Sequence, residues 1–288
     1  MKEPIVEVID KNITRDTNNS TRWYQHTNAE FHSPTDKLWS VTTILGKTIP
    51  KVWLKAYDQK QLIMLLLEGL GIDMPYENTL KATYSKNKDN RPDRISFSFD
   101  GLLGDVLTNV RNNVGADSKQ KANWGTQAHD IVAKYLKGEH VEEKLFDVDT
   151  PVRNSVRSFQ DWHNNEGKSF VVLNNLIEKT VYHKTERFAG TADAILADKE
   201  TGELFIVDWK TGFVGNEARY QVAALAAAWN SHYAYEPESK ITKGYIIQLP
   251  RDDRKYTIHT VKNKESLGTA FISAVTWHEE LQNERGDE

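Results

Sequence analysis

Two aspartates and a lysine are the residues of this chain whose types and spacing most clearly suggest chemistry. Asp193 lies in one apolar run, and Asp208 and Lys210 lie at the end of the next. The turn-forming residues 198–202 separate the two runs, which predicts a β-hairpin. Because side chains alternate along a strand, Asp208 and Lys210 should share one face while Trp209 points to the other. Two carboxylates and an ammonium group placed in this way are suited to metal-assisted hydrolysis of phosphodiesters.

A longer series of motifs surrounds these three residues. Gly190 and Asp193 form G-x-x-D, and residues 208–212 form D-x-K-T-G. A histidine, His129, precedes them in a predicted helix, and Gln221 follows them in another. In this order the motifs resemble the PD-(D/E)xK nuclease superfamily, in particular its RecB-like exonuclease branch. The resemblance implies a restriction-endonuclease-like α/β core, in which helices flank a central mixed sheet, with an N-terminal helical lobe.

The resemblance covers roughly residues 120–230 and departs from the family at one position. The family's downstream helix carries Q-x-x-x-Y, and Leu225 stands at the tyrosine position here. Residues 40–45 also resemble the N-terminal part of phage-type members. The order of histidine, G-x-x-D, D-x-K-T-G and glutamine carries the resemblance, since D-x-K alone is a common pattern.

The resemblance also implies a division of chemical roles. Hard divalent cations prefer oxygen ligands, so Asp193 and Asp208 are expected to bind one or two Mg²⁺ or Mn²⁺ ions, with the Trp209 carbonyl as a backbone ligand. A nitrogen ligand from His129 would favour manganese without excluding magnesium. Lys210 is expected to orient or deprotonate the attacking water and to offset charge on the phosphate.

Several of the candidate site residues could have either a functional or a purely structural role. Glu178 resembles the additional catalytic acid of the family, but an ion pair with Lys179 or Lys184 would explain it equally well. His129 could instead lie on a helix surface, and Asp208 with Lys210 could form a surface ion pair. The predicted contacts to nucleic acid are Thr211, Arg219, Tyr220 and Gln221.

Composition limits the class of protein without deciding its function. The chain has 288 residues and a formal net charge of −4, which argues against a generic basic coat protein for nucleic acid but not against a nuclease with an acidic site. Two basic stretches, 81–94 and 241–264, could contact DNA or lie in solvent. There is no cysteine, which excludes thiolate chemistry and an iron–sulfur cluster bound by cysteines. The sequence shows no signal region or membrane span, so we expect a cytoplasmic protein, in the host cytoplasm if it is viral.

Periodicity and turn residues predict the elements that position the motif. We expect an N-terminal helical lobe with a short β-hairpin over residues 1–115 and the nuclease core over 116–288. Helices are predicted at 41–70 (broken at Pro50), 100–114, 119–137, 151–166, 217–229 and 265–280, and strands at 170–173, 177–182, 189–196, 204–209, 244–249 and 256–261.

These observations predict a metal-dependent DNA exonuclease that hydrolyses phosphodiester bonds from DNA ends in recombination, replication or repair. The alternatives are a structure-specific endonuclease of the same superfamily and a DNA-binding module with an idle nuclease core. Expected partners are single-stranded DNA or duplex ends and a recombination or single-strand-binding protein, with no membrane. The presence of Asp193, Asp208, Lys210 and His129 argues against an idle core.

Overall fold

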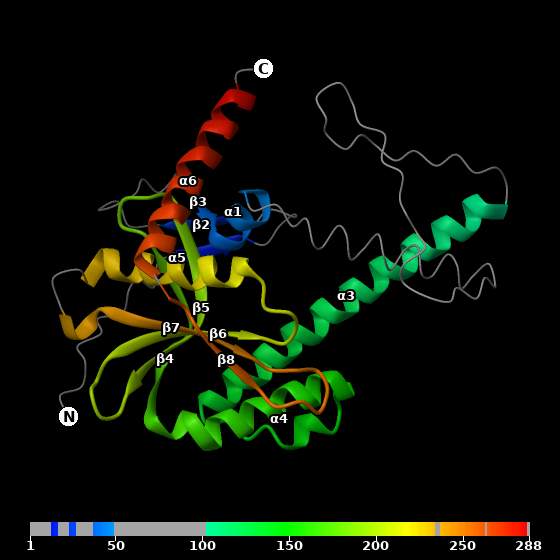
Figure 1. Cartoon of the computed structure of the whole chain (residues 1–288), viewed down its shortest axis with the longest axis horizontal. Helices are drawn as coiled ribbons and strands as arrows, with labels where there is room; N and C mark the ends of the chain where they lie inside the picture. Colours follow the sequence, from blue (N-terminus) through cyan, green and yellow to red (C-terminus); the bar gives the residue numbers. More distant parts are fainter. Residues whose placement is uncertain are drawn as a thin grey trace. The chain divides into compact units, whose positions relative to one another are not determined.

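The computed structural model describes residues 13–16, 23–26, 37–48, 102–233, 237–262 and 264–286. The chain divides into two compact units, residues 1–50 with 123–288, and residues 51–122. The first unit is an α/β structure built on one mixed sheet of eight strands (Figure 1). The basic stretch 81–94 lies outside the described residues.

The strands follow the order β1-β2-β3-β5-β6-β7-β8 across the sheet, and β4 pairs with β5. The strands are β1 (Ile13–Asp16), β2 (Trp23–His26), β3 (Lys37–Ser40), β4 (Phe170–Tyr182), β5 (Phe188–Asp198), β6 (Leu204–Lys210), β7 (Ile241–Gln248) and β8 (Thr257–Thr260). The α-helices are α1 (Val41–Thr48), α3 (Leu102–Leu136), α4 (Thr150–Asn165), α5 (Asn216–Tyr233) and α6 (Lys264–Gly286). Short 3₁₀ helices are η1 (Glu143–Leu145), η2 (Glu166–Ser169) and η3 (Pro237–Ser239).

The direction of each strand pair follows from its connection. A tight turn joins β5 to β6, and these strands pair antiparallel as the sequence predicted. β6 and β7 pair in parallel, which requires a crossover, and α5 supplies it. Their register places Lys210 beside Gln248, although 38 residues separate the two along the chain.

Helices cover both faces of the sheet (Figure 1). On one face α5 packs with α1 and α6 against residues such as Ile206 and Ile246. On the other face α3 and α4 pack against Val207 and Trp209. The small residues that face α5 allow a close approach: a Cβ added to Gly190 would meet Leu225 Cδ2 at 2.6 Å. The ends of β5 and β6 that carry Asp193, Asp208 and Lys210 therefore lie between two helical layers.

The structure differs from the sequence prediction at α3 and β4. Residues 102–136 form one continuous helix in place of two, because Gly115 costs only about 1 kcal/mol in a helix and no proline interrupts the run. The helix ends before Gly138, whose φ of 81° suits glycine, as predicted. The two strands expected between 170 and 182 are one strand whose register shifts between Val172 and Ile177.

The N-terminal boundary also differs from the predicted lobe of residues 1–115. β3 pairs in parallel with β5, and Leu38, Val41 and Ile44 are buried in the core next to α5. The described residues before position 50 thus complete the sheet instead of forming a separate helical lobe. Local patterns could not show this, because the pairing of β3 with β5 joins segments almost 150 residues apart.

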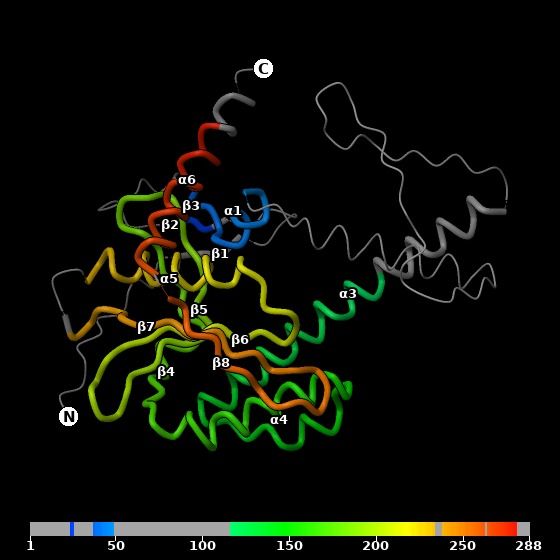
Figure 2. Tube along the Cα trace, viewed as in Figure 1, coloured from blue at the N-terminus to red at the C-terminus, as the bar shows by residue number. Residues whose placement is uncertain are grey.

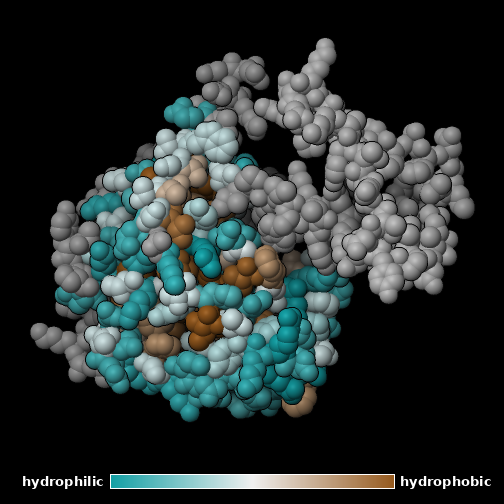
Figure 3. All heavy atoms as spheres, viewed as in Figure 1, coloured by the Kyte–Doolittle hydropathy of each residue, from teal (hydrophilic) through white to brown (hydrophobic). Residues whose placement is uncertain are grey.

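The described surface is mostly polar. In Figure 3 hydrophilic residues dominate the visible face, and apolar residues occur in small groups. Among the helices that the structure describes, none combines the length and apolarity that a membrane crossing requires.

Candidate metal and catalytic site

Asp193 and Asp208 meet where the ladder between β5 and β6 ends. Ala194 pairs with Val207 at that end, so the same register continued by one residue would set Asp193 across from Asp208. The backbone N–H of Trp209 donates a hydrogen bond of 2.7 Å to Asp193 Oδ2. This bond holds the Asp193 carboxylate at the point where the two strands stop pairing.

Lys210 is held between the acid of its own strand and a residue of α5. Its Nζ lies 2.8 Å from Asp208 Oδ2 and 3.0 Å from Oδ1, and it donates to Gln221 Oε1 at 3.1 Å. Trp209 packs against Phe159 on the opposite face, so the predicted alternation is confirmed. The Asp208 side chain is only 3% exposed, which excludes the surface ion pair as an explanation.

His129 reaches the site from α3. Its Nδ1 lies 3.4 Å from Asp193 Oδ1. Its neighbours Ala128 and Ile131 are buried between α3 and α4, which fixes the rotation of this helical turn. One donor atom from each of His129, Glu178 and Asp193 lies within 4.8 Å of the others, a spacing at which the three could hold a metal ion.

Glu178 joins this group through the register of β4 against β5, and its backbone conformation is unusual. Ile177 pairs with Ala194 and Lys179 with Ala192, which leaves Glu178 at the level of Asp193 on the neighbouring strand. Its φ is 52°, the left-handed region that residues with a Cβ enter at a cost of about 1–2 kcal/mol. Strain of this kind concentrates at functional sites, which supports a role for the carboxylate beyond an ion pair with a neighbouring lysine.

The charges of the site are strongly coupled. Burial opposes protonation of His129, but the charge of Asp193 and its hydrogen bond to His129 outweigh this effect. Together they raise the pKa of His129 to about 9. Burial raises the pKa of Asp208 to about 6, against the opposing charge of Lys210. For Lys210, burial disfavours the cation, yet the charges of Asp208 and Asp193 raise its pKa. The acids thus stabilise the protonated forms of His129 and Lys210. A metal ion bound by His129 would have to displace the imidazole proton, because only the deprotonated ring nitrogen can be a ligand.

The other predicted site residues have different surroundings. Thr211 is buried and accepts a hydrogen bond from Arg251, Arg219 is exposed, and Tyr220 packs partly buried against the core. The predicted role of the Trp209 carbonyl as a ligand stays a prediction. Leu225, at the family's tyrosine position, is buried against Gly190 and therefore serves packing.

Two residues beside the site were not assigned to it from the sequence. Gln248, at the end of β7, donates to the Gly212 carbonyl at 2.8 Å, and Arg251 donates to Thr211 Oγ1 at 3.2 Å. The sequence placed Arg251 only within a basic stretch. The parallel pairing of β6 with β7 brings both residues to the strand end that carries Lys210.

The comparisons with known proteins add no family to these observations. No protein-family model matches the chain, and no curated protein sequence is significantly similar to it.

The strain at Glu178 predicts that glycine and alanine variants at this position reverse their usual order of stability. At an ordinary strand position alanine is more stable than glycine by roughly 0.5–1 kcal/mol. At position 178 we expect Glu178→Gly to unfold at equal or higher denaturant concentration than Glu178→Ala, because only glycine relieves the positive φ. Both variants should bind Mn²⁺ more weakly than the wild type, as measured by calorimetry. Lys179→Gly and Lys179→Ala are the matched controls, and there the alanine variant should be the more stable. If alanine is also the more stable at position 178, Glu178 is not strained.

Proposed function

We propose that this protein is a divalent-metal-dependent DNA nuclease of the PD-(D/E)xK type that hydrolyses phosphodiester bonds from DNA ends. The observation that supports the proposal best is the meeting of His129, Glu178 and Asp193 beside the buried pair of Asp208 and Lys210. The motif order that led to this expectation is spread over two strands and two helices. The fold brings its members together with Glu178 of a third strand.

The donor set fits a divalent cation. One nitrogen and two carboxylates converge, and buried Asp208 lies close enough to Asp193 for its pKa to respond to that charge. His129, Glu178 and Asp193, with Asp208, would hold Mg²⁺ or Mn²⁺. Such an ion activates water and neutralises charge on a phosphate when bound.

The protein's own residues supply orientation and charge. The Lys210 ammonium contacts both Asp208 of its own strand and Gln221 of α5, so it has a defined position next to the acids. A cation held in this way can orient the attacking water and offset the charge that develops on the phosphate. The hydrogen bond from the Trp209 N–H orients the Asp193 carboxylate, and the Ala128–Ile131 packing positions His129.

Two alternatives remain distinguishable by experiment. An endonuclease of the same superfamily would use the same site on closed DNA, and an idle module would bind DNA without cutting it. The intact acids, lysine and histidine support an active enzyme, and the motif's resemblance to RecB-like exonucleases supports attack at ends.

The proposal is tested with end-labelled linear DNA and covalently closed circular DNA, each with Mg²⁺, with Mn²⁺ and with chelator. We expect mononucleotides or short products from linear DNA only, and complete loss of cleavage with chelator. Nicking of the closed circle would favour the endonuclease. Binding without cleavage under every metal condition would favour the idle module, and cleavage with chelator would contradict the metal site.

A further inference from the structure

The loop between β7 and β8 is anchored on both sides of the candidate site. Ser155 Oγ of α4 donates to the carbonyls of Leu249 and Pro250, each at 3.2 Å, and Asn154 Nδ2 donates to the Arg251 carbonyl at 3.1 Å. Leu249 N donates to the Lys210 carbonyl at 2.7 Å. In Figure 2 this loop lies against α4, which agrees with these bonds. The backbone at position 251 is therefore fixed relative to Lys210.

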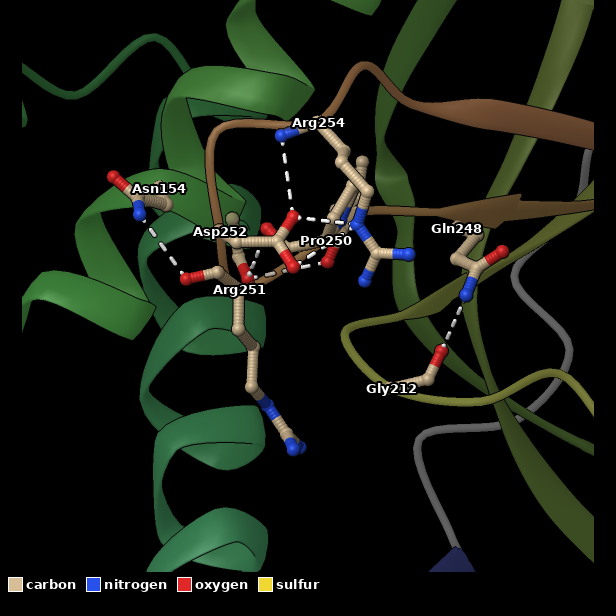
Figure 4. A network of polar contacts seen from close by, with 9 residues as sticks. Asn154, Gly212, Gln248, Pro250, Arg251, Asp252 and Arg254 are labelled. Carbon is tan, nitrogen blue, oxygen red and sulfur yellow. Dashed lines mark hydrogen bonds and ion pairs between the residues drawn. The ribbon is translucent and has the colours of Figure 1, made fainter.

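The guanidinium of Arg251 lies directly beside the D-x-K-T-G segment. It donates to Thr211 Oγ1 at 3.2 Å, and a Cβ added to Gly212 would lie 3.7–3.9 Å from its terminal atoms. A Cβ at Gly125, one helical turn before His129, would lie 4.0 Å from its Nη2. Figure 4 shows the side chain extending away from the Asp252 and Arg254 pair. The guanidinium thus lies between the lysine strand and the histidine helix.

We propose that Arg251 binds a phosphate group of the strand being cleaved and so positions that strand over the site; this inference rests on the proposed nuclease function. Arginine presents a planar set of donors that matches two phosphate oxygens at once. Arg251 is half-buried, and hydrogen bonds anchor the loop that carries it. The side chain therefore loses little further conformational freedom when it binds a phosphate, so the contact is preorganised. Thr211 is the residue that directs the guanidinium toward the site.

Other basic residues of the same stretch are arranged differently and serve as comparisons. Arg254, three residues along the same loop, is 75% exposed and is bound by Asp252 at 2.8 Å. Lys243 on β7 is bound by Glu203 at 2.6 Å. These two side chains lie at the surface, whereas Arg251 is partly buried and reaches inward to Thr211. Arg254 is therefore the matched control.

The experiment measures DNA binding and cleavage separately, with the full chain. Binding of a single-stranded and a duplex oligonucleotide is measured with chelator over a range of salt concentrations, and KM and kcat are measured with Mn²⁺. Losing one phosphate contact should reduce the slope of log affinity against log salt by about 0.7 for single strands or about 0.9 for duplex. For Arg251→Gln we expect this reduction in the salt slope, and we expect the Kd for DNA and the KM each to rise by about tenfold or more. Arg254→Gln should match the wild type.

Two further variants separate phosphate binding from a structural role. Arg251→Lys keeps the charge and should retain most of the salt slope while losing part of the affinity. Thr211→Val removes the anchoring hydroxyl, which is neutral and releases no counterions, so the salt slope should stay at the wild-type value. If Thr211→Val reproduces the full effect of Arg251→Gln on the slope, or if the melting temperature of Arg251→Gln accounts for its lost binding, the arginine is structural and the proposal is wrong.

The possible outcomes distinguish a failure of the Arg251 proposal from a failure of the proposed nuclease function. If the wild type cleaves DNA and Arg251→Gln keeps the wild-type slope and KM, the nuclease stands and the inference is overturned. If the wild type binds with an Arg251-dependent slope but never cleaves, the phosphate contact stands and the catalytic function fails. A wild type that neither binds nor cleaves DNA overturns both.

Discussion

Asp208→Asn is expected to lower the rate of DNA cleavage by at least about 100-fold while leaving the fold intact. The asparagine has nearly the same shape, but it carries no charge to attract a cation or to hold the Lys210 ammonium, which Asp208 contacts at 2.8 Å. Burial raises the pKa of Asp208, so its charged form is disfavoured in the fold, and the charge of Asp193 still stabilises the Lys210 cation. Removing the Asp208 charge should therefore cost little stability. Single-turnover cleavage of end-labelled DNA with Mn²⁺, together with thermal unfolding, checks both parts.

Variants of Lys210 provide the control for this result. Lys210→Met should abolish cleavage as well, but it leaves the buried Asp208 carboxylate without its cation, at a cost of up to about 3 kcal/mol of stability. In the double variant Asp208→Asn with Lys210→Met, stability should recover while cleavage does not. Wild-type cleavage rates in either single variant, at unchanged stability, would show that the pair has no catalytic role.

The second large effect is expected at His129. His129→Ala should weaken the affinity for Mn²⁺ by about 10- to 100-fold and lower cleavage to match, because it removes one donor of the group that includes Glu178 and Asp193. A partial loss of the coordination shell should be partly rescued by raising the Mn²⁺ concentration. Calorimetric titration of Mn²⁺ and the metal dependence of cleavage measure the two effects.

The affinity for DNA separates a metal ligand from a substrate contact. With chelator present, His129→Ala should bind DNA about as well as the wild type. The exposed His140, in the segment after α3, is the matched control, and its replacement by alanine should change neither metal affinity nor cleavage. A loss of metal-free DNA binding as large as the loss of cleavage would make His129 a substrate contact.

The sequence alone determined the features of the site that depend on neighbours along the chain. The turn after Asp198 and the alternation of residues 208–210 follow from a period of two, and the structure has both. The apolar residues before Lys210 predicted a buried strand, which explains why Asp208 is enclosed. Gly138 marked the end of α3 because its positive φ suits glycine.

Only the tertiary structure decided which of these segments meet. The register of β4 against β5, with a φ of 52° at Glu178, brought Glu178 level with Asp193. Arg251 reached the site through the parallel pairing of β6 with β7, and the residues before position 50 entered the sheet through β3. The physical reason is that periodicity and turn residues fix local backbone conformation, whereas register and crossover connections arise from packing between segments far apart in the chain.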